Sequence, residues 1–450
     1  MHSNILRTLS TAFIILLASA CGADSDIHPD SKDGGSTQVS IQLSVTVGQN
    51  RDSRAGRPLE STDNMQAVSN VRVYLFKADA GADPADNKAY RYCHFTVEGS
   101  EPLPYYYIPA FEKDAVWESD TDETHAFLLD PYLEKGYSYK LLAVGRDDVS
   151  EGSDDSGLLR PSSSSGAAGW TATGEPGEAT TLEEAAMAIN LRGVRLQTCE
   201  LFSGCSEAIT VDDAHNEFTT AIRMSRAVAG VLMYIENIPT HFTALASFTR
   251  PSIMPPYEDM PLITKGKEYK VSAVAIAPVT ITRMVGLTAG TSCGGADINE
   301  NFRGYYSDFS FINSQERDGI FVNTNPGNEA HPNSLLAGNF VLPVDKPGPL
   351  KVIDGYGELD HTLYLVFYTF DNDMGDHTFA TPFFWYPIEN ATNSQGSVVT
   401  ESSYRLEANH IYCLGEKNSR TDAPVDLSAL SAGSRSGSKN DPLLILRGWE

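Results

Sequence analysis

The chain has 450 residues, 41% hydrophobic and 20% charged, so it is long enough for two or three domains with ordinary cores. A formal net charge of −26 excludes nucleic acid and anionic lipid surfaces as the main partners, because both would repel the chain. After the first 20 residues no apolar run reaches the ~20 residues of a membrane-spanning helix.

The first 20 residues have the pattern of a secretory signal peptide. Arg7 precedes the apolar stretch Ala12–Leu17, and the small residues 18–20 precede Cys21. The segment resembles a bacterial lipoprotein signal, which implies removal of residues 1–20, diacylation of the Cys21 sulfur and acylation of its new amine. Two or more acyl chains bind a membrane firmly. The alternative is an ordinary signal peptide with an incidental cysteine.

The residues after Cys21 predict a tether and then a strand. Residues 21–37 are polar, which is typical of a flexible tether. Acidic residues just past Cys21 resemble the export tags of surface lipoproteins in some Gram-negative anaerobes. Strict alternation over Ile41–Val47 then predicts a strand with one buried face.

The rest of the first half is predicted to be mainly β. Residues 146–180, rich in Asp, Ser, Gly and Pro, predict a long surface loop. Thr181–Ala188, with acidic residues early, predicts a short helix. Strands are predicted at Val71–Leu75, Phe127–Pro131 and Tyr137–Val144.

The second half repeats this logic, and helical periodicity is rare throughout. Lys135–Val144 and Lys265–Val274 share six of ten residues, which indicates two related domains unless a common turn–strand pattern arose twice. We place the domains at residues 38–203 and 204–450. Strands are predicted at Ala208–Val211, Phe218–Ser225, Ala229–Ile235, Tyr269–Ile276, Asn339–Pro343, Leu363–Phe370, Phe379–Tyr386 and Leu443–Leu446.

Five cysteines remain once Cys21 is used for the lipid, so at least one thiol is free or pairs with another chain. Cys199 and Cys205 bracket a short loop, and we expect a disulfide between them in an exported chain.

Motifs of enzyme chemistry are weak. Gly290–Gly294 matches G-x-S-x-G, but no helical pattern follows it, so we interpret it as a loop. The histidines lack zinc-motif spacing, and Asp371, Asp373 and Asp376 are interpreted as solvated turn residues. We expect no catalytic residue, no metal and no cofactor. The aromatic residues of segment 364–386 either pack in a core or form a platform for sugar rings.

Several segments together resemble the lipoprotein anchor subunits of type V fimbriae and their fimbrillin-like relatives. The segments are Val71–Lys77, Lys135–Gly145, Glu200–Gly204, Ile222–Pro239, Leu335–Val344, Ala408–Lys417 and Asp422–Ser428. The resemblance implies an all-β chain with two tandem transthyretin-like (Greek-key) β-sandwich domains, located at the cell outer membrane. Its implied partners are fimbrial shaft or accessory subunits.

The same resemblance implies assembly by strand exchange, in which one subunit's last strand completes its neighbour's sheet. The candidate donor strand is Leu443, Leu444, Ile445 and Leu446; the alternative is that this segment is the last strand of its own domain.

Shaft subunits of this kind lose their first strand when an arginine-specific protease cuts the loop after it. Arg51, Arg54 and Arg57 stand at that place, although a solvated basic loop would look the same. A lipid-held anchor should keep Ile41–Val47, whereas a tip or accessory adhesin should be cut. A surface glycan-binding lipoprotein is the third hypothesis.

Overall fold

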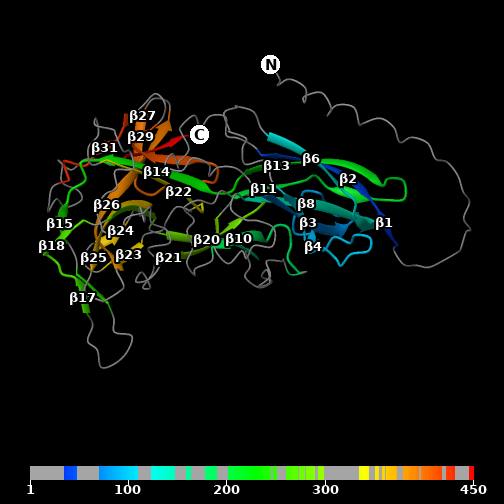
Figure 1. Ribbon diagram of the computed structural model, residues 1–450, viewed down its shortest axis with the longest axis horizontal. Helices are drawn as coiled ribbons and strands as arrows, with labels where there is room; N and C mark the ends of the chain where they lie inside the picture. Colours follow the sequence, from blue (N-terminus) through cyan, green and yellow to red (C-terminus); the bar gives the residue numbers. More distant parts are fainter. Residues whose placement is uncertain are drawn as a thin grey trace, which may run out of the picture. The chain divides into compact units, whose positions relative to one another are not determined.

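Figure 1 shows the computed structural model of the chain. Apart from Gly35, its described residues all belong to the unit Ser36–Glu450. Every regular element among them is a β-strand, which confirms the expected all-β class, while the Greek-key connectivity stays a prediction. The described residues are 35–47, 70–109, 123–146, 159–163, 177, 179–189, 201–244, 247–250, 260–271, 273–278, 280–288, 292–297, 334–343, 350–353, 357–359, 361–371, 379–394, 397–417, 422–430 and 445–449.

The first large sheet gathers strands from the first half of the chain (Figure 1). The strand expected at Ile41–Val47 lies inside this sheet, not at its edge. Its order is β4 (Arg91–Cys93), β3 (Asn70–Asp79), β8 (Tyr137–Arg146), β11 (Leu201–Cys205), β13 (Glu217–Arg226), β2 (Ser40–Val47) and β6 (Glu123–Leu129), with β5 (Tyr106–Pro109) on β3 and β12 (Ile209–Val211) on β8.

The second large sheet belongs to the second half. The last described strand, β32, lies within this sheet. The order is β19 (Ala273–Pro278), β25 (Leu363–Asp371), β26 (Phe379–Ser394), β32 (Ile445–Trp449), β28 (Ile411–Leu414), β14 (Ala229–Glu236) and β22 (Leu335–Val341), with β27 (Ser397–Glu401) on β26 and β31 (Val425–Asp426) on β14.

Smaller sheets complete the described strands. One four-stranded sheet joins the halves of the chain, because β10 from the first half pairs with β20 from the second. Its order is β21 (Ser292–Asp297), β20 (Thr280–Gly286), β10 (Ala185–Ile189) and β9 (Leu159–Ser163). The two-stranded sheets are β1 (Ser36–Gln38) with β7 (Tyr132–Glu134), β15 (His241–Thr243) with β18 (Glu268–Lys270), β16 (Phe248–Arg250) with β17 (Met260–Ile263), β23 (Leu350–Ile353) with β24 (Gly357–Leu359), and β29 (Glu416–Lys417) with β30 (Asp422–Ala423).

Two local predictions are wrong. The helix expected over Thr181–Ala188 is one turn followed by β10. Thr181 and Glu184 do form the reciprocal hydrogen bonds of a helix start: the backbone N–H of Glu184 donates to Oγ1 of Thr181, and the backbone N–H of Thr181 donates to Oε2 of Glu184, both at 3.3 Å. Pairing of β10 with both β9 and β20 then overrides the helical propensity of its alanines. The loop expected over residues 146–180 contains β9.

Strand β3 of the first large sheet is buried on both faces. Along β3, Val71, Val73 and Leu75 join one core cluster, and the alternate residues Tyr74 and Phe76 join another. Burial on both sides explains why residues 73–76 of this strand are a continuous apolar run. The second of these clusters also contains Leu182, Ala185, Met187, Ala227, Val228, Leu287 and Leu342.

The change from the first to the second large sheet comes after residue 226. The predicted domain boundary between residues 203 and 204 falls inside β11, and β13 beyond it pairs with β2 of the first sheet. The next strand, β14, starts at Ala229 in the second sheet. The division into domains 38–203 and 204–450 stays a prediction.

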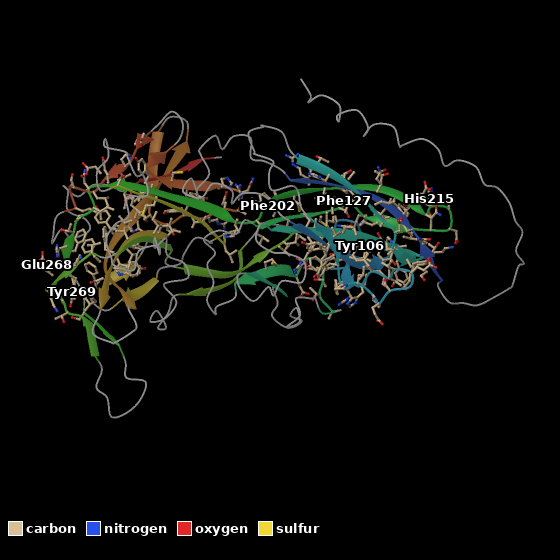
Figure 2. The ribbon with its side chains drawn as sticks, viewed as in Figure 1. Tyr106, Phe127, Phe202, His215, Glu268 and Tyr269 are labelled. Atoms are coloured by element: carbon tan, nitrogen blue, oxygen red, sulfur yellow. The ribbon has the colours of Figure 1, made fainter. Side chains whose placement is uncertain are left out.

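The repeated sequence segment corresponds to a repeated tyrosine corner. The Tyr139 hydroxyl accepts a hydrogen bond from the backbone N–H of Glu134 at 2.9 Å, and the Tyr269 hydroxyl (Figure 2) accepts one from Thr264 at 2.8 Å. The turn between each donor and its tyrosine contains a glycine in the left-handed region, Gly136 or Gly266.

A third corner escaped the sequence comparison. The backbone N–H of Glu407 donates to the Tyr412 hydroxyl at 2.9 Å, and Asn409, with φ of 63°, stands where the other corners have glycine. Asparagine tolerates this conformation better than most residues. This corner leads into β28.

Candidate functional site

The first candidate site is the position of β2 in the first sheet. β2 pairs in parallel with β13 from Ser40↔Glu217 to Val47↔Met224, and antiparallel with β6 from Ile41↔Leu129 to Val47↔Glu123. We call the space between β13 and β6 the β2 slot. Both backbone edges of β2 are therefore engaged along almost its whole length.

The alternation that predicted β2 gives it one fully buried side. Ile41, Leu43 and Val45 are each 0% exposed, as is Val39 just before the strand, whereas Gln42 is exposed. The four apolar side chains belong to the core cluster that also contains Ile222 and Met224 of β13. The predicted half-buried strand is confirmed, and its slot is lined by that core.

The second candidate site is the position of β32. β32 pairs in parallel with β26, from Glu389↔Ile445 to Ala391↔Arg447. It pairs antiparallel with β28, from Ile411↔Trp449 to Leu414↔Leu446. We call the space between β26 and β28 the β32 slot. The described part of the candidate donor, Ile445 and Leu446, is thus the last strand of its own sheet in this structure.

The two slots share one plan. In each, a strand close to one end of the chain has a parallel neighbour on one side and an antiparallel neighbour on the other. The sequence predicted β2, β6, β13 and β26 but not which of them pair, because nothing local specifies pairing over such separations. It missed β28 as a strand, for which the short run Ile411–Leu414 after a left-handed Asn409 was the available signal.

Several predicted site residues lie outside the described part of the chain. These are Cys21, Arg51, Arg54, Arg57, Cys199, Leu443 and Leu444. Lipidation and processing therefore stay predictions. Cys205 ends β11 as a free thiol, and its pairing with Cys199 also stays a prediction.

The described thiols with shifted pKa values lack the features of nucleophiles. Burial raises the pKa of Cys93 to about 12, although nearby Lys77 opposes the shift. Burial likewise raises the pKa of Cys205 to about 11, against the opposing charge of Lys140. A catalytic thiol needs a lowered pKa, so these side chains act as small apolar groups.

The G-x-S-x-G motif does not form a nucleophile elbow. Ser292 begins β21, which pairs antiparallel with β20 through Val285↔Ser292 and Met284↔Cys293. An elbow needs a strand, a sharp turn and then a helix. Among the described side chains, no group of three or more His, Cys, Asp or Glu is placed to hold a metal ion. In the described residues no helix has the length and apolar character of a membrane span.

Four aromatic residues of β25 and β26 belong to the second core cluster: Phe367, Phe383, Phe384 and Tyr386. Phe367, Phe383 and Phe384 are at most 1% exposed. The Phe242 ring stacks on Phe384 with centroids 4.4 Å apart and meets Phe367 at 4.7 Å. Tyr364, Tyr368, Trp385 and Tyr386 are buried as well. The packing interpretation is confirmed for these described side chains, which do not form an exposed platform, while the side chains of Phe370 and Phe379 lie outside the described ones.

No family model matches the chain, and no curated protein matches it. Solved structures do resemble it. A Bacteroides eggerthii protein assigned to cell adhesion has a TM-score of 0.43 and 11% identity over 92% of this chain and 96% of its own. A fimbrial assembly protein from Parabacteroides distasonis has a TM-score of 0.32 and 9% identity, covering 86% of this chain and 94% of its own.

The fimbrial anchor protein Mfa2 from Porphyromonas gingivalis is also among these neighbours. Its TM-score is 0.26 and its identity 11%, over 55% of this chain and 70% of its own. Because these scores and identities are low, the function is inferred from the sequence motifs and the strand pairing.

Proposed function

We propose that the chain is a non-enzymatic lipoprotein of the outer membrane that anchors a cell-surface fimbria and ends its growth. The observation that carries the proposal is the seating of β2 in its slot, paired on both edges and buried on one side. A subunit whose own strand fills this slot has no place there for the strand of another subunit. The proposal explains why a lipid-bearing chain would be terminal in a fibre.

The free energy gained by burying the apolar side chains of β2 and Val39 supports the proposal that β2 stays in its slot. Burying one aliphatic side chain contributes roughly 1.5–3 kcal/mol. Val39, Ile41, Leu43 and Val45 are all 0% exposed, so together they contribute roughly 6–12 kcal/mol. That is comparable with the entire stability of a typical domain, about 5–15 kcal/mol. An empty β2 slot would therefore be refilled by another strand or the sheet would unfold.

Attachment through Cys21 gives β2 a second role. The lipidated residue precedes β2, and Arg51, Arg54 and Arg57 follow it. A cut at these arginines would leave the lipid bound to the rest of the chain only through the noncovalent pairing of β1 and β2. An anchor under load needs a covalent connection instead, so we propose that the anchor escapes this cut.

Strand exchange remains part of the proposal. Leu443, Leu444, Ile445 and Leu446 are the proposed exchanged strand, and fimbrial shaft or accessory subunits are the proposed partners. Since β32 occupies its own sheet, donation requires β32 to leave its slot. The alternative function, a tip or accessory adhesin, differs in one respect: its arginine loop would be cut. The glycan-binding alternative loses support because the described aromatic side chains of segment 364–386 are buried.

The decisive experiment is N-terminal analysis of the protein from its native outer membrane. An acylated Cys21 with an intact loop supports the anchor. A mature start at Asp52, Ala55 or Pro58 contradicts it and favours the tip or accessory role. The matched variant replaces Arg51, Arg54 and Arg57 with lysine, which keeps the charge but removes the cleavage sites. An anchor should work unchanged with this loop, whereas a processed subunit should fail to assemble.

A genetic test addresses the role in the fibre. Deleting the gene should give shed or overlong fimbriae, and the Cys21→Ser variant should fail to restore attachment. Fibres of normal length that stay firmly attached in the deletion strain would contradict the proposal.

A further inference from the structure

The first described strands are held in one continuous antiparallel register. β1 pairs with β7 and β2 pairs with β6, and the register runs without a shift from Ser36 of β1 to Val47 of β2. Between the two strands, the backbone N–H of Val39 continues the ladder by donating to the carbonyl oxygen of Pro131 at 2.9 Å. β1 and β2 are therefore attached to the first sheet as a single extended segment.

The other edge of β2 connects this segment to the second half of the chain. β2 pairs in parallel with β13 over its whole length, from Ser40 to Val47, so the N-terminal ends of both strands lie together. β13 ends at Arg226, and only Ala227 and Val228 separate it from β14 of the second sheet. The chain thus enters this pair of strands at one end and leaves it for the second sheet at the opposite end.

A pull between the two halves of the chain would therefore slide β2 along β13. Force applied before Ser36 acts on the N-terminal end of β2, and force applied beyond β14 acts on the C-terminal end of β13, in the opposite direction along the same axis. In such shear all eight pairs must break within a slip of about one residue, roughly 3.3 Å. If both strands were pulled at the same end, the pairs would open one after another over roughly 26 Å, so each step would need a severalfold lower force.

The side chains of β2 resist a small slip as well. A slip by one residue turns every side chain of a strand to the other face of its sheet. The exposed Gln42 would then enter the core, and Ile41 and Leu43, both 0% exposed, would leave it. The next register that keeps the apolar side buried is two residues away, so no partly slipped register relieves the load on the backbone pairs.

We propose that β2 and β13 form a shear clamp, a pair of parallel strands that keeps the first sheet folded while the two halves of the chain are pulled apart. The use of the clamp rests on the proposed anchoring, in which the lipid on Cys21 holds one end and the fibre pulls on the second half. The clamp itself follows from the register and is tested on the chain without a membrane. N-terminal analysis can therefore reject the anchor while the clamp holds, and pulling experiments can reject the clamp while the anchor holds.

Two pulling directions on the same chain test the clamp in an optical trap. The chain from residue 22 onward carries a peptide tag in place of its lipid, and an azide-bearing residue replaces either Thr240 or Asp213 as the second point of attachment. Both positions are exposed. Thr240 follows β14, so a pull there reaches β13 from its C-terminal end and shears the pair. Asp213 precedes β13, so a pull there opens the pair from its N-terminal end.

The clamp predicts a severalfold higher force for the first rupture through Thr240 than through Asp213 at the same pulling speed. Urea unfolding of both labelled chains should match that of the parent, so that only the direction differs, and the exposed His215 is a second attachment site at the Asp213 end. Leu43→Ala should lower the force through Thr240, whereas Gln42→Ala should leave it unchanged. Equal forces in the two directions, or a higher force through Asp213, would overturn the proposal.

Discussion

The two large sheets are each completed by a strand near one end of the chain, but the strands are held very differently. β2 runs eight residues beside β13 and buries Ile41, Leu43 and Val45 completely. β32 pairs at three positions with β26 and four with β28. The same mixed parallel and antiparallel slot therefore holds strands of different pairing length, and a change in β2 should disturb its sheet more than a change in β32 disturbs the other.

The largest effect should come from β2. Leu43→Ala removes a fully buried side chain from β2 and leaves a cavity in the first core. We expect a loss of about 2–5 kcal/mol in the free energy of unfolding. Gln42→Ala, an exposed position on the same strand, is the control and should change stability by less than about 0.5 kcal/mol. Urea unfolding measures both. Equal losses in the two variants would mean that β2 is not seated as described.

One glycine in each large sheet lies where two neighbouring strands approach closely, so substitutions at these glycines compare how tightly the two sheets are packed. A methyl group at Gly204 in β11 would overlap the carbonyl oxygen of Arg223 in β13, and one at Gly415 after β28 would overlap that of Tyr234 in β14. Gly415 also has φ of +84°. Alanine at either position should cost about 1–3 kcal/mol from overpacking, and the strained backbone should make Gly415→Ala the worse variant.

Gly81→Ala is the control for both glycines, because nothing lies within 4 Å of its added methyl group. Thermal unfolding of the three variants gives the order. If Gly415→Ala were as stable as Gly81→Ala, β28 and β14 could not approach as closely as described, and the wall of the β32 slot would need revision.

The tyrosine corners give a finer comparison. Burial raises the pKa of Tyr139 well above its usual value and that of Tyr412 to about 12, and both side chains are at most 5% exposed. Tyr139→Phe and Tyr412→Phe each leave a backbone N–H without its acceptor and should cost about 1–3 kcal/mol. Tyr269 is only partly buried, so water can replace its hydroxyl and Tyr269→Phe should cost less. Urea midpoints check the order, and a larger loss at Tyr269 would contradict it.

These corners also show how far sequence reasoning reaches. Alternation at Ile41–Val47 predicted both the strand and its buried side, because period-two patterning is local. The repeat of Lys135–Val144 at Lys265–Val274 predicted a turn–strand pattern, and the structure shows a tyrosine corner at each copy. The third used Asn409 for the same left-handed turn and was missed.

Pairing between strands that are far apart in the chain could not be predicted from the sequence. Nothing near β10 signals its pairing with β20, almost 100 residues later, and its Ala-rich composition instead predicted a helix. For the same reason, the sequence did not predict that β13 is the parallel neighbour of β2 or that β26 is the parallel neighbour of β32. The sequence indicated which strands were candidates for exchange, but only the paired structure shows where each one lies.

The smallest effect concerns β31 beside β14 in the second sheet. The Asp426 carboxylate accepts hydrogen bonds from the backbone N–H of Ser428 at 2.8 Å, from the Asn237 amide at 3.0 Å and from the Ser428 hydroxyl. These bonds, the backbone one first, lower the pKa of Asp426 below its usual 3.8. A lowered folded-state pKa adds stability that is present above the unfolded-state pKa and is lost as pH falls through the folded value.

Asp426→Asn should therefore reduce stability at pH 7, by less than about 1 kcal/mol because the site is exposed. The gap from the parent chain should begin to narrow below about pH 4 and should close once the pH is below the lowered folded-state pKa, where the parent's carboxylate is protonated as well. Ser428→Ala removes only the hydroxyl donor and keeps the stronger backbone bond, so its loss at pH 7 should be smaller than that of Asp426→Asn. Urea midpoints at neutral and acidic pH test both. A gap for Asp426→Asn that persists unchanged into acid would show that the charge of Asp426 does not help to hold β31 against β14.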